Sequence, residues 1–170
     1  KHEVYELFMD KQDSLRFETW SFPKQELVIM SNHTSVTPTL LRSDDMIDFH
    51  SPQVPLYDAL CIATVNGKKM RIARQDTFQP KHPGPETKCD EALNVLDSKA
   101  KKGGVFLLFV VPMDVLSTWT KRITDGEGGF QFNKGGRPNK SEKERMRTVK
   151  RMRQFVMGID INPSDSSRLQ

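Results

Sequence analysis

The chain has 170 residues, which is enough for one domain with a hydrophobic core and too few for two domains of ordinary size. Apolar residues make up 36% of it and charged residues 28%, and ten phenylalanines are present, so the composition excludes a disordered low-complexity chain. The two cysteines, Cys61 and Cys89, match no metal-binding spacing and predict reduced core thiols rather than a disulfide framework. No secretory leader and no apolar run of membrane-spanning length is visible, so we expect a cytoplasmic or nuclear protein.

Positive charge is concentrated toward the C-terminal end of the chain. Nine basic residues lie between Lys134 and Arg153, and only Glu142 and Glu144 oppose them, which gives this stretch a net charge of +7. The remaining residues comprise 17 basic and 20 acidic ones, a net charge of −3, so the overall +4 conceals a basic segment on a mildly acidic body. This asymmetry indicates a polyanionic partner.

The N-terminal third predicts short strands joined by loops. Residues 14–22 alternate between apolar and charged side chains, as in a half-buried strand. Residues 26–31 form a short apolar run bounded by turn-forming residues and predict a second strand. Residues 35–55 are punctuated by prolines and predict mostly loop.

The clearest local signal lies at Asn66-Gly67. This pair supplies the two positive φ angles of a type I′ turn, the connection that matches the twist of two antiparallel strands. The preceding residues 60–65 are mostly apolar, and residues 69–72 alternate between basic and apolar side chains. We therefore predict a β-hairpin centred on Asn66-Gly67.

A helix followed by a buried strand is predicted next. Residues 86–102 place their apolar side chains at helical spacing, begin with acidic residues and end with lysines, which suits the helix dipole. Gly103-Gly104 predicts the end of this helix. Residues 105–111 are apolar without interruption and predict a strand covered on both faces. Residues 115–123 fit either a short helix or a strand.

The basic segment predicts a glycine-rich loop and then an amphipathic helix over residues 141–157. Ser141 and Glu144 have the spacing of a capping box, and Gly158 predicts the end of the helix. On a helical wheel the apolar arc consists of Met146, Val149, Met152, Val156 and Met157. The opposite, cationic face consists of Lys143, Arg147, Lys150 and Arg151.

Together these elements predict a single α+β domain. The expected core spans residues 1–125 and consists of an antiparallel sheet, including the hairpin, with the helix 86–102 packed against it. The other expected regions are a glycine-rich basic loop at 126–140, a basic C-terminal helix of the same domain at 141–158, and a flexible tail at 159–170.

The glycine-rich loop carries a short motif, Gly136-Arg137-Pro138, between Lys134 and Lys140. It resembles the core of an AT-hook, in which Gly-Arg-Pro flanked by cations lies extended in a narrow A·T minor groove. Gly135 stands where that motif usually has a basic residue, so the likeness covers three residues. The resemblance implies insertion of Arg137 into a minor groove. The neighbouring Phe130-Gln131-Phe132 fits either stacking on unpaired bases or the core of a strand.

No catalytic motif is recognisable, so we expect a non-enzymatic protein without a cofactor. Asp44, Asp45, Asp48 and His50 form the one dense group of metal-ligand residue types. With Asp58 and the Lys68-Lys69 pair, this group gives the alternative of a metal-dependent nuclease. Its spacing matches no ligand motif, however, and aspartates near loops commonly form turns or caps. The four histidines stand at no zinc-binding spacing, so we expect no zinc site.

The charge pattern predicts a nucleic-acid-binding protein, with DNA favoured over RNA, that acts as a regulator or an accessory factor. Four cations on one helical face repel each other, and a polyanion would relieve that repulsion while releasing its own counterions. The alternatives are the nuclease, a viral matrix-like or adaptor protein that binds an anionic membrane or a partner, and a basic face that is merely solvated. A homo-oligomer is compatible with each of them. The predicted contact residues are Lys134, Arg137, Lys140, Lys143, Arg147, Lys150, Arg151 and Arg153.

Overall fold

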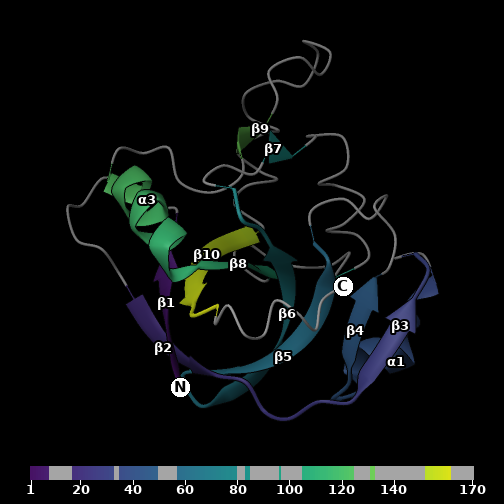
Figure 1. Ribbon diagram of the computed structural model, residues 1–170. Coiled ribbons are helices and arrows are strands. Elements are labelled where there is room, and N and C mark those ends of the chain that lie inside the picture. The colour runs from purple at the N-terminus through teal and green to yellow at the C-terminus, as the bar shows by residue number, and fades with distance from the viewer. Residues whose placement is uncertain are drawn as a thin grey trace.

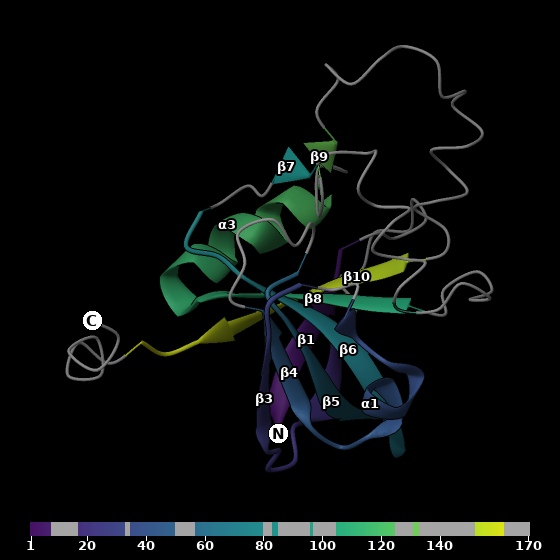
Figure 2. The same cartoon turned by 90° about the vertical axis from the view of Figure 1, so that its right-hand side faces the viewer.

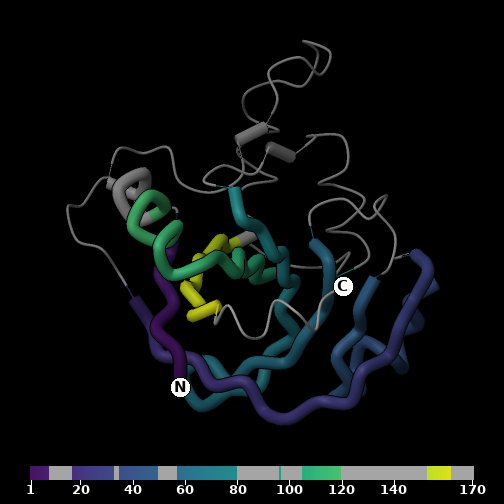
Figure 3. The backbone as a smooth tube through the Cα atoms, viewed as in Figure 1, coloured from purple at the N-terminus to yellow at the C-terminus, as the bar shows by residue number. Residues whose placement is uncertain are grey.

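The computed structural model of the protein is mostly β-structure, and its strands close into a six-stranded barrel (Figures 1 and 2). The structure describes residues 1–7, 17–32, 35–49, 57–79, 83–84, 96, 105–124, 131–132 and 152–161. Figure 3 traces the backbone of the barrel in colour. The predicted α+β class is therefore wrong, because one curved sheet dominates the described part of the chain and only short helices accompany it.

Most of the strands belong to a single sheet. Its strands are β1 (His2–Glu6), β2 (Phe17–Ser21), β3 (Leu27–Met30), β4 (Met46–Phe49), β5 (Ala59–Val65), β6 (Lys68–Asp76), β8 (Val105–Pro112) and β10 (Met152–Ile159). The short strands β7 (Pro83–Gly84) and β9 (Gln131–Phe132) form a separate parallel pair. The helices whose bounds lie in the described ranges are α1 (Pro38–Arg42) and α3 (Met113–Thr124).

The barrel closes because β5 has two different neighbours on the same edge. The order of the sheet is β2-β1-β10-β8-β6-β5-β4-β3. The last residues of β5 pair with β2, as Trp20 faces Val65, and this contact closes the ring of six strands. The first residues of β5 pair with β4 instead, as Ala59 faces Asp48. β4 and β3 therefore leave the barrel as a flap, with α1 beside them (Figure 1).

Three neighbouring barrel strands run parallel. β8 lies in the middle and pairs in parallel with β6 on one side and β10 on the other. Parallel strands require a long crossover, and α3 forms part of the connection between β8 and β10. The carboxyl ends of all three strands consequently meet at one end of the barrel.

Several predictions from local patterns are confirmed. Asn66 and Gly67 have φ angles of 50° and 76° and join β5 to β6 as an antiparallel hairpin, with Val65 facing Lys68. The apolar run over residues 105–111 forms β8, which is buried from Val105 to Val111. The strands expected at 14–22 and 26–31 contain β2 and β3.

The predicted C-terminal helix is wrong where the structure describes it. Residues 152–157 belong to β10, an interior strand of the sheet. Phe155 and Met157 lie in one core cluster and Val156 in the other, so both faces of β10 are buried. A short apolar run buried on both faces has no alternation, and its side chains therefore also fit a helical wheel. Residues 141–151 lie outside the described residues.

Gly158 does not end a helix but lets α3 pack on β10. A Cβ atom at this position would lie 2.8 Å from both Leu116 Cδ2 and Met113 Sδ. Such a contact is closer than van der Waals packing permits, so the absence of a side chain allows the first turn of α3 to approach the strand. The undecided segment 115–123 is thus helical.

Two further predictions concern residues 35–55 and residues 86–102. The mostly-loop prediction for 35–55 missed α1 and β4; α1 begins after Thr37, whose hydroxyl accepts a hydrogen bond from the Leu40 amide at 3.2 Å. The helix predicted at 86–102 lies outside the described residues except for Leu96, which packs against the core. The loop 126–140, apart from β9, and the tail beyond Ile161 also lie outside them.

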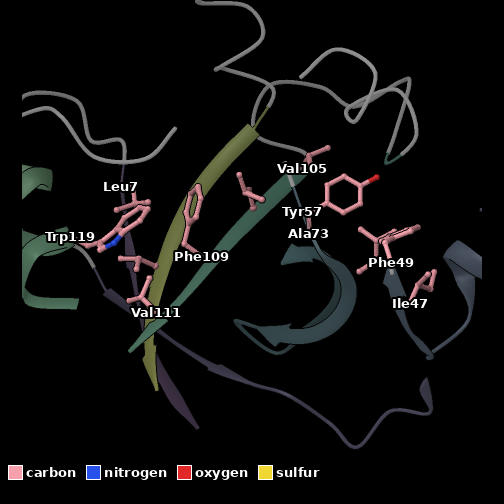
Figure 4. Close-up of a cluster of buried hydrophobic side chains, with 12 residues drawn as sticks. Leu7, Ile47, Phe49, Tyr57, Ala73, Val105, Phe109, Val111 and Trp119 are labelled. Atoms are coloured by element: carbon pink, nitrogen blue, oxygen red, sulfur yellow. The ribbon is translucent and has the colours of Figure 1, made fainter. Parts of the chain in front are cut away.

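Two core clusters lie on opposite faces of the sheet. One takes side chains from all six barrel strands, including Trp20, Cys61 and Phe155, and therefore fills the interior of the barrel. The other covers the outer face, where Phe109 packs on Trp119 of α3 with ring centroids 4.8 Å apart (Figure 4). Burial raises the pKa of the Cys61 thiol to about 11, so this thiol is no activated nucleophile.

Candidate functional site

Of the predicted polyanion contacts, one lies within the described residues. Arg153 is the second residue of β10, where it faces Phe106 of β8. The others lie outside the described part of the chain: Lys134, Arg137, Lys140, Lys143, Arg147, Lys150 and Arg151. The structure therefore brings none of these eight residues together in a described cluster, but it places the end of the basic segment at the start of a barrel strand.

Arg153 is held by acidic and aromatic groups of the barrel. Its Nε and Nη2 donate to the two carboxylate oxygens of Glu6 at 2.9 and 3.0 Å, and Nη2 also lies 3.5 Å from Glu18 Oε1. Its guanidinium carbon lies 4.9 and 5.0 Å from the ring centroids of Phe106 and Phe155. The hydrogen bonds to Glu6 raise the pKa of Arg153. Its charge is thus balanced within the barrel.

One of the carboxylates that hold Arg153, that of Glu18, also binds a side chain of the barrel interior. Glu18 Oε2 accepts a hydrogen bond of 3.1 Å from the indole N–H of Trp20, which has no exposed surface. The Trp20 ring lies 4.8 Å from that of Phe155. Arg153 therefore closes one end of the aromatic cluster inside the barrel, and the two glutamates connect β1 and β2 to β10. Sequence reasoning missed this role because Glu6 lies 147 residues before Arg153.

Arg71 in β6 has a structural task as well. Burial lowers its pKa from the usual value, since no carboxylate hydrogen-bonds to its guanidinium among the described residues. Its guanidinium bridges the C-terminal end of α1 and β5, and these hydrogen bonds hold the flap against the barrel. Its guanidinium donates to the main-chain carbonyls of Leu40, Leu41, Ser43, Asp45 and Leu60.

Two aspartates of the alternative nuclease site, Asp44 and Asp58, bind different partners. Asp44 forms an exposed ion pair of 2.5 Å with Lys69. Asp58 instead accepts from the side chain of Gln75 at 2.7 Å and from the amide of Asp76 at 2.9 Å, so it fixes the end of β6. His50 lies outside the described residues. In the described ranges no three histidine, cysteine, aspartate or glutamate side chains are grouped so that they could hold a metal ion.

A cleft that no sequence signal indicated lies at the carboxyl ends of β6, β8 and β10. Its volume is about 560 Å³, and we call it the strand-end cleft. The three segments around it are distant in the sequence, and only their parallel pairing brings them together. Its lining residues are Phe78, Pro112, Met113, Asp114, Val115, Ile159, Asp160 and Ile161.

The helices that the structure describes are all too short or too polar to cross a membrane. Comparison of the chain with protein-family models, with curated proteins and with solved structures found no match. The barrel and its charges are therefore the basis for any assignment of function.

Proposed function

We propose that the protein binds nucleic acid, with duplex DNA favoured over RNA, through the basic segment that precedes β10. In this proposal the barrel is a scaffold, and the contacts come from the residues between Lys134 and Arg151. The protein would act without catalysis, as a regulator or an accessory factor. The observation that supports it is the partition of charge along the chain, with +7 between Lys134 and Arg153 and −3 elsewhere.

The contacts of the barrel strengthen this argument. Arg153 is bound to Glu6, Arg74 forms two hydrogen bonds of 2.7 Å with Asp76, and Lys69 pairs with Asp44. These cations are thus partly neutralised within the fold. The basic segment up to Arg151 contains eight cations and two carboxylates of its own, a net charge of +6 within 18 residues of the sequence. A polyanion that binds such a segment releases its counterions and gains their entropy.

The test is the salt dependence of oligonucleotide binding, measured by fluorescence anisotropy. A duplex and a single strand of equal length are titrated across a salt series. For duplex DNA we expect log K to fall linearly with log salt concentration, with a slope of about −0.9 for each phosphate contact. Replacing Lys143, Arg147, Lys150 and Arg151 by glutamine should weaken binding at least about tenfold near 0.1 M salt and reduce the slope by up to roughly 3.6.

A matched control removes the same number of charges from the barrel. Lys1, Lys24, Arg42 and Lys68 are exposed in the described structure, and their joint replacement by glutamine should leave the slope within about one unit of the original. A slope near zero for the unmodified protein would exclude the proposal. So would equal losses in the two variants, or tighter binding to anionic vesicles than to either oligonucleotide.

A further inference from the structure

The strand-end cleft lies where the chain leaves the ends of three barrel strands. Phe78 lies two residues after β6, Pro112 ends β8 and is followed directly by the first residues of α3, and Ile159 ends β10 and is followed by Asp160 and Ile161. In Figure 2 the end of β10 and the first turn of α3 lie on the same side of the barrel. Small-molecule sites commonly have volumes of roughly 300–1,000 Å³ and commonly lie outside the carboxyl ends of parallel strands. The cleft has both properties.

Phe78 is exposed although the loop that carries it is fixed. Its side chain is 72% exposed. The amide of Thr77 donates to the carbonyl of Val110 at 3.0 Å, and the carbonyl of Gln79 accepts from the indole N–H of Trp119 at 3.3 Å. Both neighbours of Phe78 are therefore tied to the core, which fixes the backbone that carries the exposed ring beside the cleft.

The wall of the cleft combines apolar surface with negative charge. Met113 and Ile161 are 47% and 41% exposed beside Phe78. Within the described ranges the charged lining residues are Asp114 and Asp160, without a lysine or arginine. Asp114 has a structural reason for its position, since it lies in the first turn of α3 and accepts a hydrogen bond of 3.0 Å from the Val115 amide.

Asp160 has no comparable structural reason among the described residues. It follows the last residue of β10, it is exposed, and neither it nor Ile161 belongs to a helix. Two carboxylates that share a small cleft with an exposed aromatic ring repel anions and raise the local concentration of cations. A cation with an apolar body would use both features, because its charge meets the carboxylates while its body covers the exposed ring and thioether.

We propose that the strand-end cleft binds a small organic cation, an amine with an aromatic or alkyl body. The ammonium group lies between Asp114 and Asp160, and the apolar body packs on Phe78 and Met113. This site is separate from the basic segment and does not depend on the proposed binding of nucleic acid.

The test is an NMR titration of the ¹⁵N-labelled protein with protonated phenethylamine as the probe. We expect saturable shifts of the amides of Phe78, Val115 and Asp160, with a Kd on the order of 1 mM for so small a ligand. The neutral 2-phenylethanol has nearly the same shape and should bind at least about tenfold more weakly, because it lacks the charge. The anion 3-phenylpropanoate should bind more weakly still.

Two variants and one control distinguish the roles of charge and aromatic surface. Asp160→Asn should weaken phenethylamine binding about two- to fivefold and leave 2-phenylethanol binding unchanged, whereas Phe78→Ala should weaken both. Asp44→Asn removes one carboxylate that does not line the cleft and should change neither titration. These residues are exposed, so the variants are expected to fold. Equal affinity for the amine and the alcohol, unchanged binding in Asp160→Asn, or shifts confined to other residues would overturn the proposal.

Discussion

Replacing Phe155 by alanine is expected to lower the free energy of unfolding by about 3–5 kcal/mol. The Phe155 ring has no exposed surface and lies 4.8 and 5.1 Å from the rings of Trp20 and Phe106 inside the barrel. Removing it leaves a cavity among groups from β2, β8 and β10 that cannot collapse without opening the barrel. Chemical denaturation followed by tryptophan fluorescence measures the change, since Trp20 lies in the same cluster.

The control for Phe155 is the same substitution at an exposed position. Phe17 in β2 is 57% exposed, and Phe17→Ala should change the free energy of unfolding by less than about 1 kcal/mol. If Phe155→Ala does not fold, Phe155→Leu should still cost about 1–2 kcal/mol. A helix over 141–157 would place Phe155 off its apolar arc. Equal effects of Phe155→Ala and Phe17→Ala would therefore contradict the barrel position of this residue.

Replacing Arg153 by methionine is expected to lower the free energy of unfolding by about 2 kcal/mol. The change leaves Glu6 and Glu18 facing each other without their cation. Breaking a fully buried pair costs about 3–5 kcal/mol, but the side chain of Arg153 is 35% exposed, so solvent screening reduces the cost. Denaturation of Arg153→Met, of Glu6→Gln and of the double variant gives the coupling energy, which we expect to be about 1 kcal/mol.

Two comparisons separate a structural role of Arg153 from a binding role. Lys69→Met breaks an ion pair whose side chains are 55% and 67% exposed, and it should cost about 0.5 kcal/mol or less. Arg153→Met should also leave the salt slope of oligonucleotide binding unchanged under conditions in which the variant is folded. A slope reduced by about 0.9, with no loss of stability, would show instead that Arg153 contacts a phosphate.

The parts of the fold that could be predicted from the sequence are those with local causes. Asn66 and Gly67 adopt positive φ angles because asparagine tolerates them and glycine, which has no Cβ atom, adopts them without steric cost. The run from Val105 to Val111 is short, rich in valine and phenylalanine, and bounded by Gly103-Gly104 and Pro112, which favours a central strand over a helix. Such signals require no knowledge of the partner strand.

β10 could not be predicted because the strands that pair with it, and so determine its conformation, lie far from it in the sequence. Its neighbours are β8 and β1, and the pairing with β8 is parallel, so no turn sequence reveals it. Met152, Val156 and Met157 satisfy a helical wheel as well as a strand buried on both faces. Gly158 had the same ambiguity, since a glycine after an apolar run marks either a helix end or a close approach of another element.

The candidate site was predictable only in part for the same reason. The excess of positive charge between Lys134 and Arg153 is a property of the sequence itself. The pairing of Arg153 with Glu6 depends on the order of strands around the barrel, and so does the meeting of Phe78, Asp114 and Asp160 at one cleft. Neither arrangement has a local pattern that would indicate it.

The position of β10 supports both the closure of the barrel and the structural role of Arg153, and NMR spectroscopy tests it most directly. We predict amides of residues 154–158 that are protected from hydrogen exchange, and cross-strand NOEs that place Val156 beside Phe109. A continuous series of helical amide–amide NOEs through residues 141–157, without NOEs to β8, would contradict the barrel.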